Sequence, residues 1–221
     1  MDPGFSPFFA ALSLCRLLEH TLSFRPMEER SIDAALQIAR HAVALDDKDA
    51  VAHAVLGRAF AALGDHEAAI AELSQAVRLN PNLAVAHYGL GLTLVLCGKP
   101  AEALPELEAA QRLSPHDPYL WSFAMFRAWA YLRLGDLERA IESASHSVRQ
   151  PRAAYPAWGT LASALGSVGR IAEAKAALAK AIELEPRFQT KGFINEVWPN
   201  LDPVFSKRFY EGIAKIGLSP G

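Results

Sequence analysis

The 221-residue sequence has few cysteines and no long apolar run. Its two cysteines, Cys15 and Cys97, are not spaced as metal ligands, which indicates a reducing compartment. No apolar stretch approaches the roughly 20 residues that span a bilayer. The apolar segment 5–18 lacks the basic start of a signal peptide, because Asp2 is the only charged residue before Arg16. We therefore expect a cytoplasmic protein without a membrane segment.

An excess of one charge is also missing. The 22 Lys and Arg residues nearly balance the 24 Asp and Glu residues, so the chain has no basic surplus to neutralise phosphates. This argues against a nucleic-acid partner. Hydrophobic residues make up 51% of the chain and charged residues 21%, which is typical of a folded protein rather than a disordered one.

The glycines that are present include four at a regular spacing. Gly64, Gly98, Gly135 and Gly169 follow one another at intervals of 34, 37 and 34 residues. A glycine with positive φ ends a helix, so each of these predicts the turn of a helix–turn–helix unit. Small residues follow at two fixed distances, where two helices would approach closely, and a proline ends most units. The small residues are Ala69, Ala76, Ala103, Ala110, Ala140, Ser147, Ala174 and Ala181, and the prolines are Pro81, Pro115 and Pro186.

These units resemble tetratricopeptide repeats, whose pattern is W-x2-L-G-x2-Y, then A-x3-F, then P. The resemblance implies an all-α, right-handed α-solenoid with C-terminal capping helices. It also implies a scaffold that binds other proteins and is not an enzyme. Three units carry the match most clearly: His53-x2-Leu56-Gly57-x2-Phe60 with Ala69-x3-Leu73, His87-x2-Leu90-Gly91-x2-Leu94 with Ala103-x3-Leu107, and Trp158-x2-Leu161-Ala162-x2-Leu165 with Ala174-x3-Leu178.

The spacing also predicts the domain organisation. We expect a repeat array over residues 1–186 and a helical cap over 187–221, in which Asp202 begins a helix from about Pro203 to Ile216. A shorter helix is expected over residues 188–198. Because the chain begins at what looks like the end of a repeat, we also expect it to be cut from something longer. The five units are 3–48, which is stretched, 49–82, 83–117, 118–152 and 153–186.

The end of the chain carries a narrower resemblance. Residues 200–220 are similar to the tails of bacterial proteins in which tetratricopeptide repeats follow a class III adenylate cyclase or a winged-helix regulator domain. This implies an alternative function as the C-terminal sensory or regulatory region of such a protein, with the fused or neighbouring domain as its partner. It does not make the chain a cyclase, because the paired catalytic aspartates have no counterpart here.

The family resemblance also indicates which side chains face the inner wall of the array. The predicted partner-binding wall is apolar and aromatic in its middle, bounded by two arginines, and small and bare in the last unit. Such a surface suits a hydrophobic peptide, an apolar helix or a domain. Two alternatives remain open, since the chain's own C-terminal helix or a second copy in a homodimer would cover the same wall. The predicted binding residues are Arg58, Tyr88, Leu92, Val95, Met125, Phe126, Trp129 and Arg133, and the small positions include Gly159, Ser163 and Gly166.

No motif predicts catalytic, cofactor-binding or metal-binding chemistry. His53 and His87 occupy a position where the family often has tryptophan, so we interpret them as packed, hydrogen-bonded side chains. His116 lies in a turn between two prolines, and Gly98-Lys99 lacks the remainder of a phosphate-binding loop. Nothing combines a nucleophile, a base and an orienting group at a suitable spacing. We therefore expect no cofactor and no metal.

Overall fold

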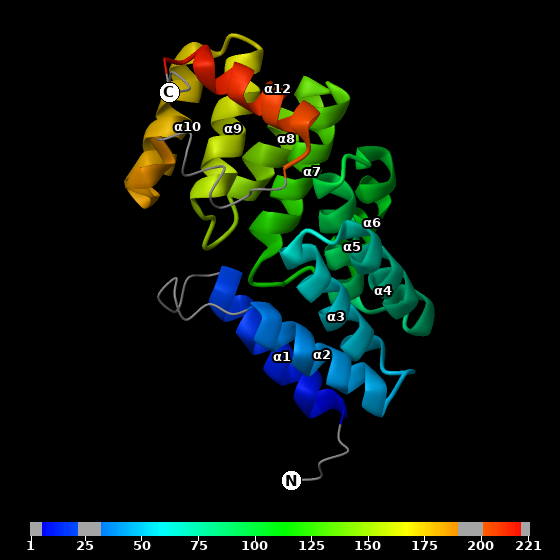
Figure 1. The fold of residues 1–221 in the computed structure, drawn as a ribbon. Coiled ribbons are helices and arrows are strands. Elements are labelled where there is room, and N and C mark those ends of the chain that lie inside the picture. Colours follow the sequence, from blue (N-terminus) through cyan, green and yellow to red (C-terminus); the bar gives the residue numbers. More distant parts are fainter. Residues whose placement is uncertain (1–5, 22–31, 190–200, 218–221) are drawn as a thin grey trace. The chain divides into compact units, whose positions relative to one another are not determined.

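The computed structural model describes residues 6–21, 32–189 and 201–217. Within these ranges every regular element is helical, as Figure 1 shows, which confirms the predicted all-α class. The chain divides into two compact units, one up to Thr93 and one from Leu94 onward. Each unit is described by itself below.

The N-terminal unit is built from paired helices. Helix α1 packs against α2, α3 packs against α4, and both α1 and α2 contact α3. Alanines on α2 allow the close approach, because Ala35 and Ala39 are fully buried beside Val55 of α3. The helices are α1 (Ser6–Thr21), α2 (Ile32–Leu45), α3 (Ala50–Leu63), α4 (His66–Leu79) and α5 (Ala84–Leu96), of which the part up to Thr93 belongs to this unit.

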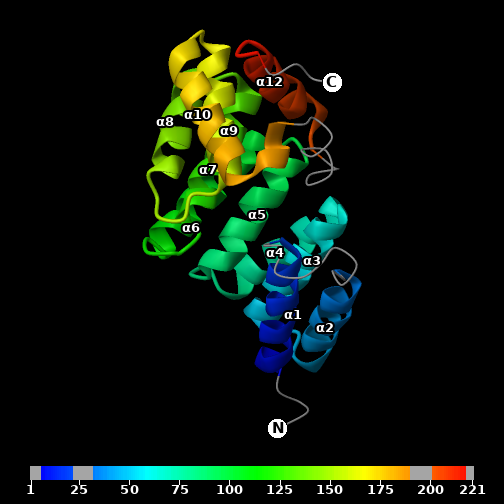
Figure 2. The ribbon, with the colours of Figure 1, turned by 90° about the vertical axis from the view of Figure 1, so that its left-hand side faces the viewer.

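The C-terminal unit repeats this pairing and adds a helix. Helix α7 pairs with α8, α9 pairs with α10, and α6 and α8 pack against the helix that follows each. The last helix, α12, lies across α9 and α7, which both ribbon views show (Figures 1 and 2). The elements are α6 (Pro100–Leu113), α7 (Leu120–Leu134), α8 (Leu137–Val148), α9 (Tyr155–Ser167), α10 (Ile171–Leu184), the 3-10 helix η2 (Pro186–Gln189) and α12 (Pro203–Ala214).

The predicted start and stop signals lie where the helices begin and end. The glycines at the four spaced positions have φ between 77° and 83°, the left-handed conformation that was expected of them. Asp49 starts α3 by accepting hydrogen bonds from the backbone N–H groups of Val51, at 2.8 Å, and Ala52, at 3.2 Å. Asp202 starts α12 in the same way and accepts from the N–H of Phe205. The α12 prediction is confirmed to within two residues at its end, whereas most of 188–198 lies outside the described residues.

The small residues of the repeats have the packing role that their spacing predicts. All eight, from Ala69 to Ala181, are fully buried between helices. In the N-terminal unit, Leu73 of α4 fits against two glycines, Gly57 and Gly89, because a Cβ atom added at either would lie 2.6 Å from its side chain. This explains why the helix pairs are close enough to stack as repeats.

Candidate functional site

The candidate site in the C-terminal unit centres on an aromatic cluster of α7. Met125, Phe126 and Trp129 are buried, with 2%, 6% and 2% of their surface exposed. The Trp129 ring stacks on Phe205 of α12, with 4.5 Å between ring centroids and 27° between planes. Phe126 contacts Trp129 edge-on at 5.1 Å. The Trp129 ring therefore lies underneath α12, with Phe126 beside it.

Trp129 also links α7 to α9 by a hydrogen bond. Its indole Nε1 donates to the hydroxyl of Thr160 at 2.7 Å, and that hydroxyl donates to the carbonyl of Pro156 at 2.8 Å. A buried indole N–H needs such a partner, because leaving it unpaired would cost about 1–3 kcal/mol. The bond fixes the orientation of the ring on which Phe205 stacks.

An ion pair joins the end of α7 to the start of α12. Arg133 Nε lies 2.5 Å from Asp202 Oδ2, and the side chains of the two residues are 26% and 11% exposed. The same carboxylate accepts a hydrogen bond from the Phe205 N–H at 2.8 Å. Asp202 therefore caps α12 and at the same time holds it to the predicted site residue Arg133.

Helix α9 offers α12 a surface of small residues instead of rings. The Ser163 hydroxyl donates to the carbonyl of Phe209 in α12 at 2.8 Å. A Cβ atom added at Gly166 would collide with the backbone carbonyl of Gly212, so the two helix backbones are in direct contact there. Gly159 likewise leaves room for the ring of Phe188, which is 2% exposed. The small wall positions Gly159, Ser163 and Gly166 are therefore the contact surface for the C-terminal segment.

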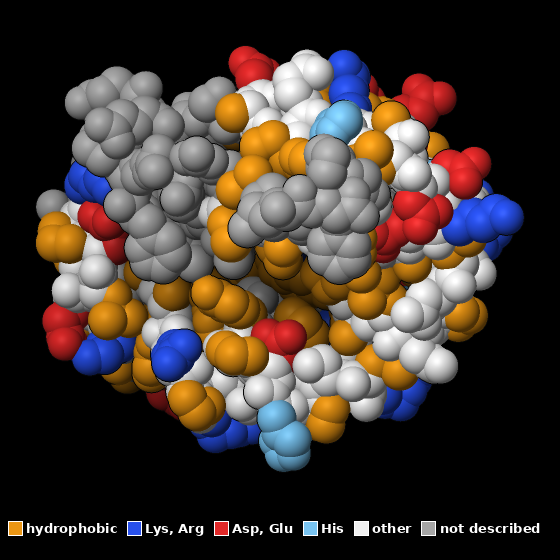
Figure 3. Space-filling view, turned by 90° about the horizontal axis from the view of Figure 1, so that it is seen from below, with side chains coloured by type: hydrophobic (Ala, Val, Ile, Leu, Met, Phe, Trp, Pro, Cys, Tyr) orange, Lys and Arg blue, Asp and Glu red, His pale blue; other side chains and the backbone are white. Residues whose placement is uncertain are grey.

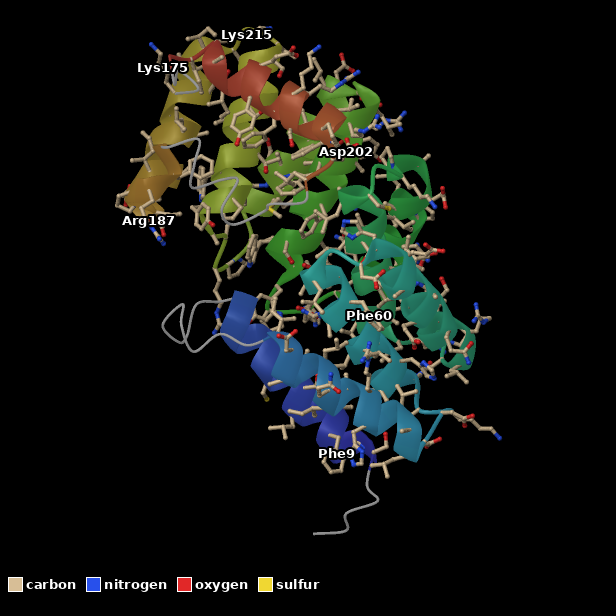
Figure 4. All side chains as sticks on the ribbon, in the orientation of Figure 1. Phe9, Phe60, Lys175, Arg187, Asp202 and Lys215 are labelled. Atoms are coloured by element: carbon tan, nitrogen blue, oxygen red, sulfur yellow. The ribbon has the colours of Figure 1, made fainter. Side chains whose placement is uncertain are left out.

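A basic residue of α12, Arg208, and its C-cap, Lys215, reach the carboxyl ends of these helices. Arg208 donates to the carbonyl of Leu132 at 3.2 Å, and Lys215 donates to the carbonyl of Ser167 at 2.9 Å. Both acceptors lie in the last turn of a helix, where the helix dipole is negative and favours a basic side chain. Asp202 and Lys215 lie at opposite ends of α12, as Figure 4 shows.

The eight predicted site residues thus have different surroundings. Arg58, Tyr88 and Leu92 belong to the N-terminal unit and are partly exposed, on α3 and α5. Val95 is 3% exposed and lies in the last turn of α5, where its carbonyl accepts a hydrogen bond from the N–H of Gly98. The remaining four lie on α7, and the structure brings Trp129 and Arg133 together under α12. In this unit the C-terminal helix itself occupies the wall.

Sequence reasoning missed the residues of α12 that complete this arrangement. Phe205 and Phe209 are four residues apart and so lie on one face of the predicted C-terminal helix, but no local pattern places either of them on Trp129. The available signal was the coincidence of small residues on α9 with Gly212 in the tail, because facing glycines permit close helix crossing.

The two repeat histidines have structural surroundings, as predicted. Each is 8% exposed. His53 lies 2.6 Å from the Glu72 carboxylate through Nδ1 and 2.9 Å from the Asp47 carbonyl through Nε2. His87 Nε2 lies 2.9 Å from the Pro81 carbonyl, six residues before it, which is the same offset. The histidine thus joins the first helix of the repeat to the turn before it.

The described residues contain no group of three or more His, Cys, Asp or Glu side chains that would hold a metal ion. Burial raises the pKa of the Cys97 thiol, so this cysteine has none of the activation of a nucleophile. Among the helices of the described part of the chain, none is long and apolar enough to cross a membrane. Acidic and basic side chains are interspersed around the face drawn in Figure 3.

Comparison with known proteins assigns the repeats. A family model described as TPR repeat matches residues 57–96, and two described as Tetratricopeptide repeat match 88–156 and 155–188. Together they span 57–188 without a gap. No curated protein matches the chain.

Solved structures of repeat proteins are similar in fold. PilW, described as a type IV pilus biogenesis factor, is 18% identical with a TM-score of 0.69, over 96% of this chain and 91% of that one. A thermophilic TPR protein of Thermus thermophilus is 22% identical with a TM-score of 0.62, over 91% and 99%. YrrB, described as having an unusual peptide-binding site, is 20% identical with a TM-score of 0.57, over 84% and 89%. These similarities confirm the predicted α-solenoid class.

Proposed function

We propose, from the premise that the chain belongs to the tetratricopeptide repeat family, that it is a non-catalytic scaffold that binds a protein segment on the first helices of its repeats. The family's fold suggests protein–protein interaction, and YrrB, which shares the fold, is described as having a peptide-binding site. The segment is an apolar helix or a hydrophobic peptide. In the N-terminal unit the binding residues are Arg58, Tyr88 and Leu92, and in the C-terminal unit they are Val95, Met125, Phe126, Trp129 and Arg133.

One observation carries this proposal. The α7–α9 wall already holds an amphipathic helix, α12, through a ring stack on Trp129 and an ion pair with Arg133. A groove between first helices that accepts the apolar face of a helix is a recurrent mode of peptide recognition. The chemistry that binds α12 is the chemistry that would bind a partner.

The test compares partner capture by two variants of the full chain. Tyr88→Ala removes a partly exposed ring from the proposed N-terminal binding residues, whereas Arg78→Ala removes an exposed side chain from α4. If Tyr88 is an interface anchor, its truncation costs about 2 kcal/mol, or roughly thirtyfold in affinity. We expect Tyr88→Ala to lose a partner, identified by quantitative mass spectrometry of captured proteins, that Arg78→Ala retains. Equal capture by both variants, with matching melting temperatures, would contradict the proposal.

Two alternatives make different predictions. If the chain is the regulatory region of a cyclase or transcription regulator, a reading frame for that domain will precede Met1 in phase. The similarity of residues 200–220 to the tails of such fusion proteins supports the regulatory-region alternative. These residues include the helix α12. If the chain is instead a self-associating module, light scattering will show a dimer, and a monomer at high concentration would rule this out.

A further inference from the structure

Helix α12 has the contacts of a ligand as well as those of a cap. A helix that only closed the repeat array would pack on the outer side of the second helix of the last repeat, which is α10. Instead α12 packs chiefly against the first helices α9 and α7, which line the binding wall in this family. It is therefore bound on the surface where a partner would be expected.

The apolar contacts of α12 come from residues spaced along one face. Phe205 and Phe209 are 2% and 6% exposed, and Ile213 is 3% exposed. They are separated by four residues each, which places them on one side of the helix. Val204, on another face, is 41% exposed. The helix thus presents two consecutive rings to the wall, as peptide helices do in a groove.

The polar contacts fix the direction and register of the bound helix. Asp202 is paired with Arg133 at one end, and Lys215 donates to the Ser167 carbonyl at the other. Reversing the helix would separate Asp202 from Arg133 and would remove Lys215 from the Ser167 carbonyl, which lies at the negative end of the α9 dipole. The polar contacts of the wall therefore favour a helix with an acidic residue at its N-cap and a basic residue at its C-cap.

A glycine is required where the backbones meet. A Cβ atom added at Gly212 would collide with the Ser163 carbonyl and would lie 2.7 Å from the hydroxyls of Ser163 and Ser167. The carbonyl belongs to the backbone of α9 and is unable to rotate away. The wall therefore selects for glycine at this position of the bound helix.

We infer that the α7–α9 wall is a helix-binding site whose resident ligand is α12, and that a partner helix with the same anchors binds there by displacing it. The anchors are an aspartate at the N-cap, phenylalanines three and seven residues after it, and a glycine ten residues after it. This inference rests on the proposed scaffold function and specifies the partner of the C-terminal unit. Because the partner helix binds only molecules whose wall is vacant, its apparent affinity is its intrinsic affinity multiplied by the vacant fraction.

The experiment empties the wall in the full chain and offers it a synthetic helix. Gly212→Leu prevents α12 from seating, and the probe is a fluorescent peptide with the sequence of residues 201–217. We expect this variant to bind the peptide at least about tenfold more tightly than the wild type, in which α12 competes. Val204→Ala is the matched control, since it alters an exposed residue of α12 and should bind the peptide as weakly as the wild type.

Peptide variants test the anchors. Phe209→Ala within the peptide should weaken binding to the Gly212→Leu chain about tenfold or more, and Asp202→Ala by a smaller factor, whereas Val204→Ala should have no effect. A Gly212→Leu chain that keeps its helical circular dichroism but binds no peptide overturns the inference. If that variant fails to fold, Asp202→Ala in the chain provides the same comparison with a smaller release of α12.

The outcomes also separate this inference from the general function. A wild-type dimer that Gly212→Leu converts to a monomer would make a second copy the occupant and overturn the assignment. Loss of a partner in Tyr88→Ala, together with no peptide binding to Gly212→Leu, would leave the scaffold function in place and remove only the α12 site. Peptide binding with unchanged partner capture would keep the helix site and contradict the role of Tyr88.

Discussion

Helices α7 and α9 occupy equivalent places in successive repeats, yet they hold α12 by opposite means. Residues 34 positions apart correspond, so Trp129 of α7 is the counterpart of Ser163 in α9, and Leu132 is the counterpart of Gly166. On α7 a large ring stacks against Phe205. On α9 the side chains are so small that the backbones of α9 and α12 meet.

The difference shows how a repeat framework carries specificity. The framework positions, such as the buried alanines Ala140 and Ala174, set the distance between helices and are alike in the two repeats. The wall positions differ between the two repeats, and together they decide which helix fits. A large residue contributes apolar area, about 25 cal/mol for each Å² removed from water, whereas a small one contributes steric selection. Substitutions on α7, on α9 and in the Arg133–Asp202 ion pair separate the apolar, steric and electrostatic contributions to the binding of α12.

The largest effect is expected at the α7 end. Trp129→Ala removes a 2% exposed ring that contacts Phe126, Phe205 and the Thr160 hydroxyl. Truncation of a buried tryptophan typically costs about 3–5 kcal/mol, measured as the free energy of unfolding in urea. Trp129→Phe is the control, because it keeps a ring and loses chiefly the hydrogen bond, at about 1 kcal/mol. A loss below about 1 kcal/mol for the alanine variant would show that α12 does not rest on this ring.

An intermediate effect is expected at the α9 end. Glycine to alanine within a helix normally stabilises it by about 1 kcal/mol. At Gly166 the added methyl group collides with the Gly212 carbonyl, and overpacking of this kind costs about 1–3 kcal/mol. We expect a net loss of stability, measured by thermal denaturation. The matched control is Gly89→Ala, where the new Cβ atom meets only side chains, the nearest being the movable end of Leu73 at 2.6 Å. A more stable Gly166→Ala variant would contradict direct backbone contact.

The sequence predicts the framework of this fold better than its site. The spaced glycines, the buried alanines and the caps Asp49 and Asp202 follow from local rules of helix termination and close packing, which act over one or two turns. The inner-wall assignment came from the family pattern. The covering of Trp129 by Phe205 joins positions 76 residues apart, and local periodicity has no information about such a contact.

Small residues show the same limit in another way. The spaced Gly and Ser residues on one face of α9 give no sign of a binding surface when large side chains are expected to make the contacts. It becomes interpretable only with a facing helix, because close approach is a property of two surfaces. Gly212 in the tail was the complementary half of that signal, and the two halves lie 46 residues apart between Gly166 and Gly212.

The smallest effect is expected for the ion pair between Arg133 on the wall and Asp202 on the bound helix. Asp202→Ala should cost more than Arg133→Ala, because the aspartate also caps α12 and loss of a cap costs about 0.5–2 kcal/mol. A double-mutant cycle should give a coupling of about 0.5–1 kcal/mol, since both side chains are partly buried. The control is the exposed pair of Arg139 and Asp136, where the coupling should be smaller. If the two couplings were equal, Arg133 would not select an acidic residue at the N-cap of the bound helix, and the ion pair would contribute nothing to specificity.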